Sequence, residues 1–184
     1  MISTDKTRNA AELTAPIARL WEVSAGKLDS LDQSWQPEAG TPVFTVEGRY
    51  TSRGWTEWTQ GFGFGSMLLQ FDATGESRFL ELGRQGTLAH MPPHLTHAGV
   101  HDHGFNNIST FGNLRRLVLE DRLDCEATEL QLYELALKVS GAVQAARWTD
   151  LPNGLGYIYS FNGPHSLFSD TIRSLRVLAM SDRL

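Results

Sequence analysis

His101-Asp102-His103-Gly104-Phe105 stands directly before a segment, residues 107–119, in which apolar side chains recur at helical spacing. A carboxylate flanked by two imidazoles at the start of an apolar helix is a costly arrangement, because a charged group loses hydration near a core. Asp170 stands in the same place in a second apolar helical segment, residues 169–184. Two aspartates at two helix starts predict an acid/base site.

Each aspartate also has a purely structural interpretation. Asp is favoured at helix N-termini, where its carboxylate accepts backbone N–H bonds and meets the positive end of the helix dipole. Taken alone, Asp102 or Asp170 is better explained as a cap. The neighbouring residues favour chemistry, because aromatic rings and imidazoles are common in sugar-binding sites. These neighbours are Phe105 and His101 near Asp102, and Phe168 and His165 near Asp170.

Helical periodicity dominates the rest of the chain and predicts an all-α fold of about six helices. The expected helices cover residues 11–23, 65–73, 77–91, 107–119, 127–146 and 169–184. The Gly- and Pro-rich stretch 26–54 is expected to be a long loop, and Gly61, Gly63 and Gly65 to favour a loop or a close helix contact. A small hairpin or extended loop is expected between Trp148 and His165.

Composition limits the possible classes of protein. At 184 residues with 41% apolar and 20% charged side chains, the chain is typical of one globular domain, residues 1–184, with residues 1–10 expected to be flexible. A net charge of -5 argues against nucleic acid as a partner. The single cysteine, Cys125, forms no internal disulfide, and neither a secretory signal nor a membrane span is visible. We therefore expect a cytoplasmic protein without membrane attachment.

Histidines and tryptophans offer further candidate ligands. Five histidines fall within residues 90–103 and suggest zinc, but the segment includes Pro92-Pro93 and lacks a His-Glu-x-x-His motif. We expect solvated or hydrogen-bonded histidines there, with no metal and no cofactor. Trp58 and, less strongly, Trp55 lie beside Gly and Thr in a segment where a ring can stack on a sugar, although a place in the core is the more ordinary interpretation of either ring.

Three segments, in the same order, resemble the unsaturated glucuronyl hydrolases of glycoside hydrolase family 88. Residues 58–69 with the following Thr74-Gly75-Glu76 turn resemble that family's Trp-Thr-x-Gly-Phe-Trp-x-Gly stretch and Thr-Gly-Asp turn, with Gly63 where the family has Trp. Residues 101–105 match its His-Asp-x-Gly-Phe signature, and Asp170 resembles its second catalytic aspartate. The family fold is an (α/α)6 toroid of twelve helices, so the resemblance implies the N-terminal half of a toroid.

The resemblance also implies an activity. Such enzymes remove a 4,5-unsaturated uronic acid from the non-reducing end of lyase-generated oligosaccharides by hydration of a vinyl ether. By this likeness Asp170 is the general acid/base and Asp102 orients the reacting ring. Trp58, His101 and Trp148 are then expected to bind the substrate.

Other interpretations remain open at this stage. The chain is also compatible with a non-catalytic half barrel that binds sugar or a protein, with an unsaturated rhamnogalacturonyl hydrolase, or with an epimerase of toroid fold. A half toroid exposes inner helix flanks, so a second chain or a C-terminal half is expected to cover that open face.

Overall fold

Two layers of helices and two small hairpins make up the computed structural model, which describes residues 9–35, 39–54 and 58–184. The elements in chain order are η1 (Ala10–Leu13), α1 (Thr14–Ser34), β1 (Thr41–Val46), β2 (Arg49–Arg53), α2 (Thr59–Thr74), α3 (Ser77–His90), α4 (Pro92–Leu95), η3 (Gly104–Gly112), α5 (Asn113–Leu119), α6 (Ala127–Ala145), β3 (Trp148–Asp150), β4 (Gly156–Ile158), η4 (Ser169–Thr171) and α7 (Ile172–Arg183).

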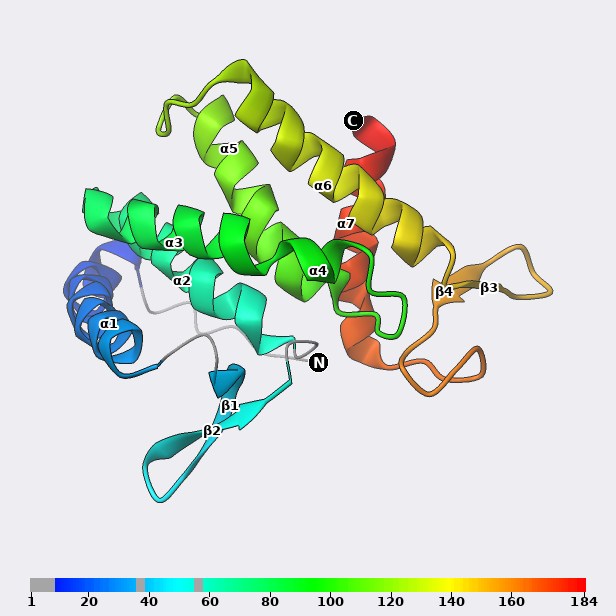
Figure 1. The fold of residues 1–184 in the computed structure, drawn as a ribbon, viewed down its shortest axis with the longest axis horizontal. Coiled ribbons are helices and arrows are strands. Elements are labelled where there is room, and N and C mark those ends of the chain that lie inside the picture. Colours follow the sequence, from blue (N-terminus) through cyan, green and yellow to red (C-terminus); the bar gives the residue numbers. More distant parts are fainter. Residues whose placement is uncertain (1–8, 36–38, 55–57) are drawn as a thin grey trace.

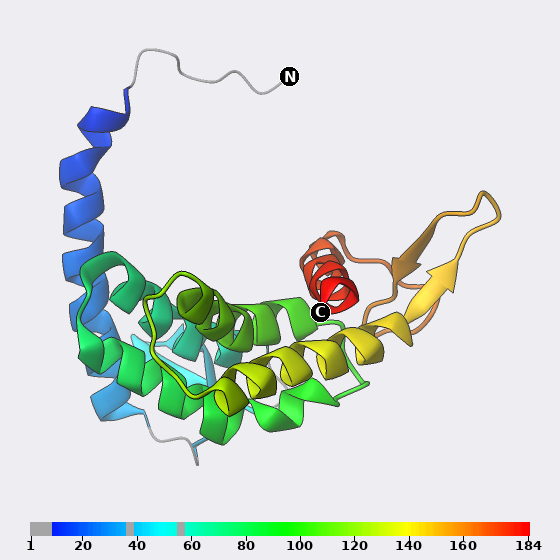
Figure 2. The ribbon, with the colours of Figure 1, turned by 90° about the horizontal axis from the view of Figure 1, so that it is seen from above.

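Successive helices alternate between the layers (Figures 1 and 2). One layer contains α2, the continuous η3–α5 helix and α7, with η3 packed against both neighbours. The other contains α3 and α6, which pack on α2 and α7, whereas α1 packs on α2 at one end. All six expected helices are present, and this all-α, toroid-like alternation confirms the predicted fold class. The short helix α4 was not predicted.

The core lies between the two layers. Its fully buried side chains come from helices of both: Leu68, Phe79, Leu114, Leu117, Tyr133, Leu137 and Val177. The outward faces of α3 and α6 carry charged side chains, which is the pattern of an amphipathic helix with one face in a core. Packing of these apolar stripes, rather than intrinsic propensity, supplies most of the stability of such helices.

The first turns of α2 contain the glycines that we expected in a loop or at a close contact. The helix begins at Thr59, earlier than predicted, and passes close to η3. A Cβ atom added at Gly61 would lie 2.6 Å from the Asn106 carbonyl oxygen, whereas one added at Gly63 would meet nothing within 4 Å. Close helix packing therefore outweighs the helix propensity lost at Gly61.

The expected loop over residues 26–54 was wrong. Helix α1 continues through Gly26 to Ser34 because Leu28, 8% exposed, anchors its C-terminal half in the core. The antiparallel hairpin β1–β2 follows, closed by Glu47 and Gly48, which both have positive φ, as a two-residue hairpin turn requires. The Trp35 ring packs edge-on against Tyr50, so the hairpin is held beside α1.

The hairpin expected near residues 148–165 is confirmed as β3–β4, with Thr149 opposite Tyr157. No helix in the described part of the chain is long and apolar enough to cross a membrane. Of the segment expected to be flexible, residues 1–8 lie outside the described residues, and Asn9 caps η1 by accepting a bond from the Glu12 backbone N–H.

Candidate active site

Two predicted catalytic aspartates converge on one buried histidine. Asp102 precedes η3, and Asp170 lies in η4, immediately before α7. The His101 Nε2 atom lies 3.3 Å from Asp170 Oδ1 and 3.7 Å from Asp102 Oδ1. The side chain of His101 is 3% exposed and that of Asp102 is 12% exposed, whereas 49% of the Asp170 side chain is accessible. One carboxylate is therefore enclosed and the other faces solvent.

Two aromatic rings enclose His101. Phe161 stacks on the imidazole with centroids 6.3 Å apart and planes inclined by 17°, and Phe168 meets it edge-on at 6.3 Å. Although His101 Nε2 is within ion-pair distance of Asp170, neither ring nitrogen makes an aligned hydrogen bond with any described residue. The imidazole is thus held by apolar walls and keeps its hydrogen-bonding capacity. Phe161 was missed because its alternating sequence suggested only a strand.

Gly104 and Ser174 explain how Asp170 comes close to His101. The Ser174 hydroxyl donates to the His101 carbonyl oxygen, and the Gly104 N–H donates to Ser174 Oγ at 3.4 Å. A Cβ atom at Gly104 would lie 2.7 Å from the Ser174 backbone nitrogen and still closer to the Arg173 carbonyl. The glycine therefore lets α7 approach η3. Sequence reasoning missed Ser174, although its position four residues after Asp170 on the same helix was a usable signal.

His103 faces the core rather than Asp170. Its Nε2 lies 2.9 Å from the His97 carbonyl oxygen and its Nδ1 lies 2.8 Å from Ser140 Oγ. A carbonyl only accepts, so Nε2 carries the proton and Nδ1 accepts from the serine hydroxyl. Burial is the main reason why the pKa of His103 falls from 6.5 to about 4. His103 is therefore a neutral, structural histidine.

His94 belongs to a second buried network, which joins α2, α4 and η3. Its Nε2 donates to Gln60 Oε1 at 2.6 Å, and its Nδ1 accepts from Asn106 Nδ2 at 3.2 Å. Asn106 Oδ1 in turn accepts the Gly61 N–H at 2.9 Å. Burial, reinforced by His103 and His97, lowers the pKa of His94 to about 4. No three His, Cys, Asp or Glu side chains among the described residues are placed to share a metal ion.

Arg147 joins the two loops beside the site, and sequence reasoning did not single it out. Its Nη2 atom donates to the Tyr159 and Ser160 carbonyl oxygens at 2.9 and 2.8 Å, and Nη1 donates to the Ala98 carbonyl. The residue is 3% exposed, and burial lowers its pKa from the ordinary value. Since these carbonyls belong to the loops that precede Asp102 and follow β4, the guanidinium fixes both walls of the site.

The tryptophans predicted to bind substrate lie in different surroundings. Trp58 is 42% exposed and packs edge-on against Phe62 and Phe105, which connects it to the segment that carries Asp102. Trp148 lies in the β3–β4 hairpin and donates to Asp150 Oδ1 at 3.0 Å. The hairpin that carries Trp148 is a different element from those that carry His101, Asp102 and Asp170. Trp55 lies outside the described residues.

Cavities lie along the α2 side of the site. A cavity of about 260 Å³ lies between α2, the η3–α5 helix and α7, and includes Gly104 in its lining. A larger one of about 940 Å³ lies between α1, the β1–β2 hairpin and α2. Phe62 and Ser66 line both cavities, and Gly63 opens onto the larger one. Gly63 therefore borders open space.

Comparison with known proteins bears on the fold. No protein-family model matches the chain, and no curated protein sequence matches it significantly. The structure is similar to the crystal structure of an unsaturated glucuronyl hydrolase specific for heparin, with a TM-score of 0.68 and 19% sequence identity over 89% of this chain. The match covers 41% of that hydrolase. The chain therefore has the toroid-like helical fold of that hydrolase, and it corresponds to less than half of the hydrolase's length.

Proposed function

We propose that the chain forms part of a glycoside hydrolase that removes a 4,5-unsaturated uronic acid from the non-reducing end of lyase-generated oligosaccharides. The supporting observation is the meeting of Asp102, His101 and Asp170, with His101 Nε2 within 3.7 Å of both carboxylates. The fold of the heparin-specific hydrolase adds support, because that protein is an unsaturated glucuronyl hydrolase. Trp58 and His101 are proposed to contact the sugar.

The proposed reaction is a hydration. Protonated Asp170 gives its proton to C4 of the vinyl ether, and the resulting Asp170 carboxylate accepts a proton from the water whose oxygen bonds to C5. The product hemiketal then rearranges and releases the sugar, so one carboxyl group acts first as an acid and then as a base. Asp170 suits this role because 49% of its side chain is accessible to a substrate. The enclosed Asp102 carboxylate is proposed to orient the ring.

The test uses loss of the double-bond ultraviolet absorbance of an unsaturated disaccharide. Asp170→Asn removes the proton donor but keeps the shape, so turnover is expected to fall by about a hundredfold or more while binding is retained. Asp102→Asn is expected to lower the rate sharply as well. Asp182→Asn, an exposed aspartate near the end of α7, is the matched control and keeps the wild-type rate. Wild-type rates in both site variants would favour the capping interpretation.

A second candidate is a non-catalytic half barrel that binds sugar or a covering chain. Apolar side chains beside Asp170 favour it, since Leu167, Ile172 and Leu175 are 56%, 67% and 42% exposed. A second chain or a C-terminal half would bury such side chains. Binding of the disaccharide without loss of absorbance, by the full-length protein, would select this candidate. Turnover only of an unsaturated rhamnogalacturonan fragment would instead indicate the rhamnogalacturonyl activity.

A further inference from the structure

Two arginines follow Asp170 along one side of the last helix. Arg173 and Arg176 are three and six residues beyond it, so Arg173 is the helix-surface neighbour of both Asp170 and Arg176 at i,i+3 spacing. Both arginines line the 260 Å³ cavity between α2, the η3–α5 helix and α7. At 1.5 Å per residue, Arg176 lies about 9 Å along the axis from Asp170. Two positive charges therefore line a cavity against the helix that Asp170 precedes.

These guanidinium groups differ from several other arginines of the helical layers. Arg84, Arg115 and Arg116 each form an ion pair with a carboxylate. Within the described residues, no carboxylate oxygen lies within 4 Å of a nitrogen of Arg173 or Arg176, and both residues are exposed. Two positive charges at one cavity thus lack a protein counter-charge there, which favours binding of an external anion.

Aromatic packing fixes the position of Arg173 without neutralising it. Its guanidinium carbon lies 5.4 Å from the Phe62 ring centroid and 5.2 Å from that of Phe105. The same rings contact Trp58. A guanidinium held on ring faces keeps its N–H groups available at its edge, in a planar arrangement that matches two oxygens of an oxyanion. The charge is therefore positioned for a ligand.

The rest of the cavity lining suits an oxyanion. Ser66, Ser109 and Asn113 provide polar groups opposite the arginines, and the Phe62 ring and Ile108 provide apolar walls. A volume of about 260 Å³ exceeds the share of several water molecules, each about 30 Å³ in the liquid, and so admits a charged substituent. Among the residues that the structure describes, no aspartate or glutamate lines this cavity to oppose a negative ligand.

We propose that Arg173 and Arg176 form a subsite for an oxyanion, a sulfate ester or a carboxylate, on the sugar next to the one that reacts at Asp170. The anion belongs to the neighbouring sugar because Arg176 is displaced by about 9 Å from the acid. This inference rests on the proposed function for the identity of the ligand as an oligosaccharide. The shared chemistry is bidentate binding of two oxygens by a guanidinium.

Three disaccharides test the subsite by isothermal titration calorimetry on the full-length protein. All carry the same unsaturated uronic acid, and the second ring is neutral, sulfated or carboxylated. The wild type is expected to bind one charged disaccharide about tenfold more tightly than the neutral one, and that preference identifies the source of the oxyanion. Arg176→Gln is expected to remove the preference, and Arg176→Lys to keep part of it, because lysine retains the charge but not the planar fork.

Arg183→Gln removes the same charge from the same helix outside the cavity and is the matched control. Equal affinity for all three disaccharides, no binding at all, or equal losses in Arg176→Gln and Arg183→Gln would overturn the subsite. Arg176-dependent binding without turnover would sink the hydrolase proposal and leave the subsite intact. Turnover with binding that is independent of Arg176 would do the reverse.

Discussion

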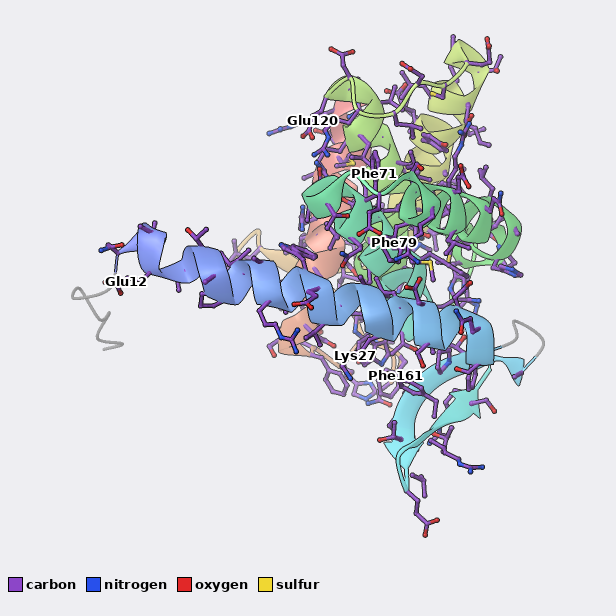
Figure 3. The ribbon with its side chains drawn as sticks, turned by 90° about the vertical axis from the view of Figure 1, so that its left-hand side faces the viewer. Glu12, Lys27, Phe71, Phe79, Glu120 and Phe161 are labelled. Carbon is purple, nitrogen blue, oxygen red and sulfur yellow. The ribbon has the colours of Figure 1, made fainter. Side chains whose placement is uncertain are left out.

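The surroundings of η3 and the α1 end of the molecule distribute polarity in opposite ways. Around η3, polar side chains are buried: His94, His103, Asn106, Asn107, Ser140 and Ser174 are at most 2% exposed. At the other end, apolar side chains are accessible: Leu13, Ile17, Leu20, Phe44 and Val46 are at least 42% exposed. Figure 3 shows the Glu12 end of α1 extending away from the body, whereas Lys27 lies over it.

The difference shows where the structure is self-contained. A buried polar group must find its partner inside the protein, and around η3 hydrogen bonds join side chains from α2, α4, α6 and α7. Removing one partner leaves another group buried and unsatisfied. The N-terminal half of α1, which is exposed, does not depend on buried hydrogen bonds of this kind. The site region should therefore respond strongly to small changes, and the α1 end weakly.

Acid should produce the largest effect. His94 and His103 have pKa values of about 4, below the unfolded value of 6.5, so the unfolded chain binds more protons between these limits. Their neutral forms contribute stability that is fully present above pH 6.5 and lost as the pH falls toward 4. Each pKa difference corresponds to about 3 kcal/mol. Urea unfolding at pH 7, 5.5 and 4 measures the loss.

His103→Gln should flatten that pH dependence, whatever it does to absolute stability. His165→Gln, which changes an exposed histidine, should leave the slope as in the wild type. Equal slopes in the wild type and His103→Gln would show that His103 titrates normally, and the contrast between the two regions would lose its electrostatic part.

A methyl group at Gly104 should have the next largest effect. Gly104→Ala places a Cβ atom against the backbone of Arg173 and Ser174, so α7 must move, and we expect a loss of about 3 kcal/mol or more in unfolding free energy. Gly63→Ala, in open space on α2, should instead stabilise by about 0.5–1 kcal/mol. Thermal unfolding of both variants decides, and a tolerated Gly104→Ala would contradict the close approach of α7.

The smallest effect is expected on the outer half of α1. Leu20→Gln changes a side chain that is 59% exposed and should alter the unfolding free energy by less than about 0.5 kcal/mol. Leu28→Ala, two turns later on the same helix, should cost about 2 kcal/mol because Leu28 is 8% exposed. Chemical denaturation compares the pair. Equal losses would mean that the exposed face of α1 is buried in solution.

Sequence patterns were most informative where one helix face is apolar. They placed the six helices, and they singled out His101, Asp102 and Asp170, which the structure brings together. They failed at Gly26, which lies inside α1, and they began the second helix too late, although the close helix contact expected as one alternative at Gly61 is present. Glycine lowers helix propensity, but burial of Leu28 and close packing against Asn106 override that local preference.

The amino-acid sequence alone determined the helical periodicity, the two aspartates at helix starts and the acidic net charge, because each is a property of residues close together in the chain. Only the tertiary structure decided which histidine lies beside the two aspartates. His101 faces the carboxylates and His103 faces Ser140, since Gly104 lets α7 pack closely and Ser174 binds the His101 carbonyl. The contacts of His101 and Gly104 with Ser174 join residues 73 and 70 positions apart, and local sequence carries no record of them.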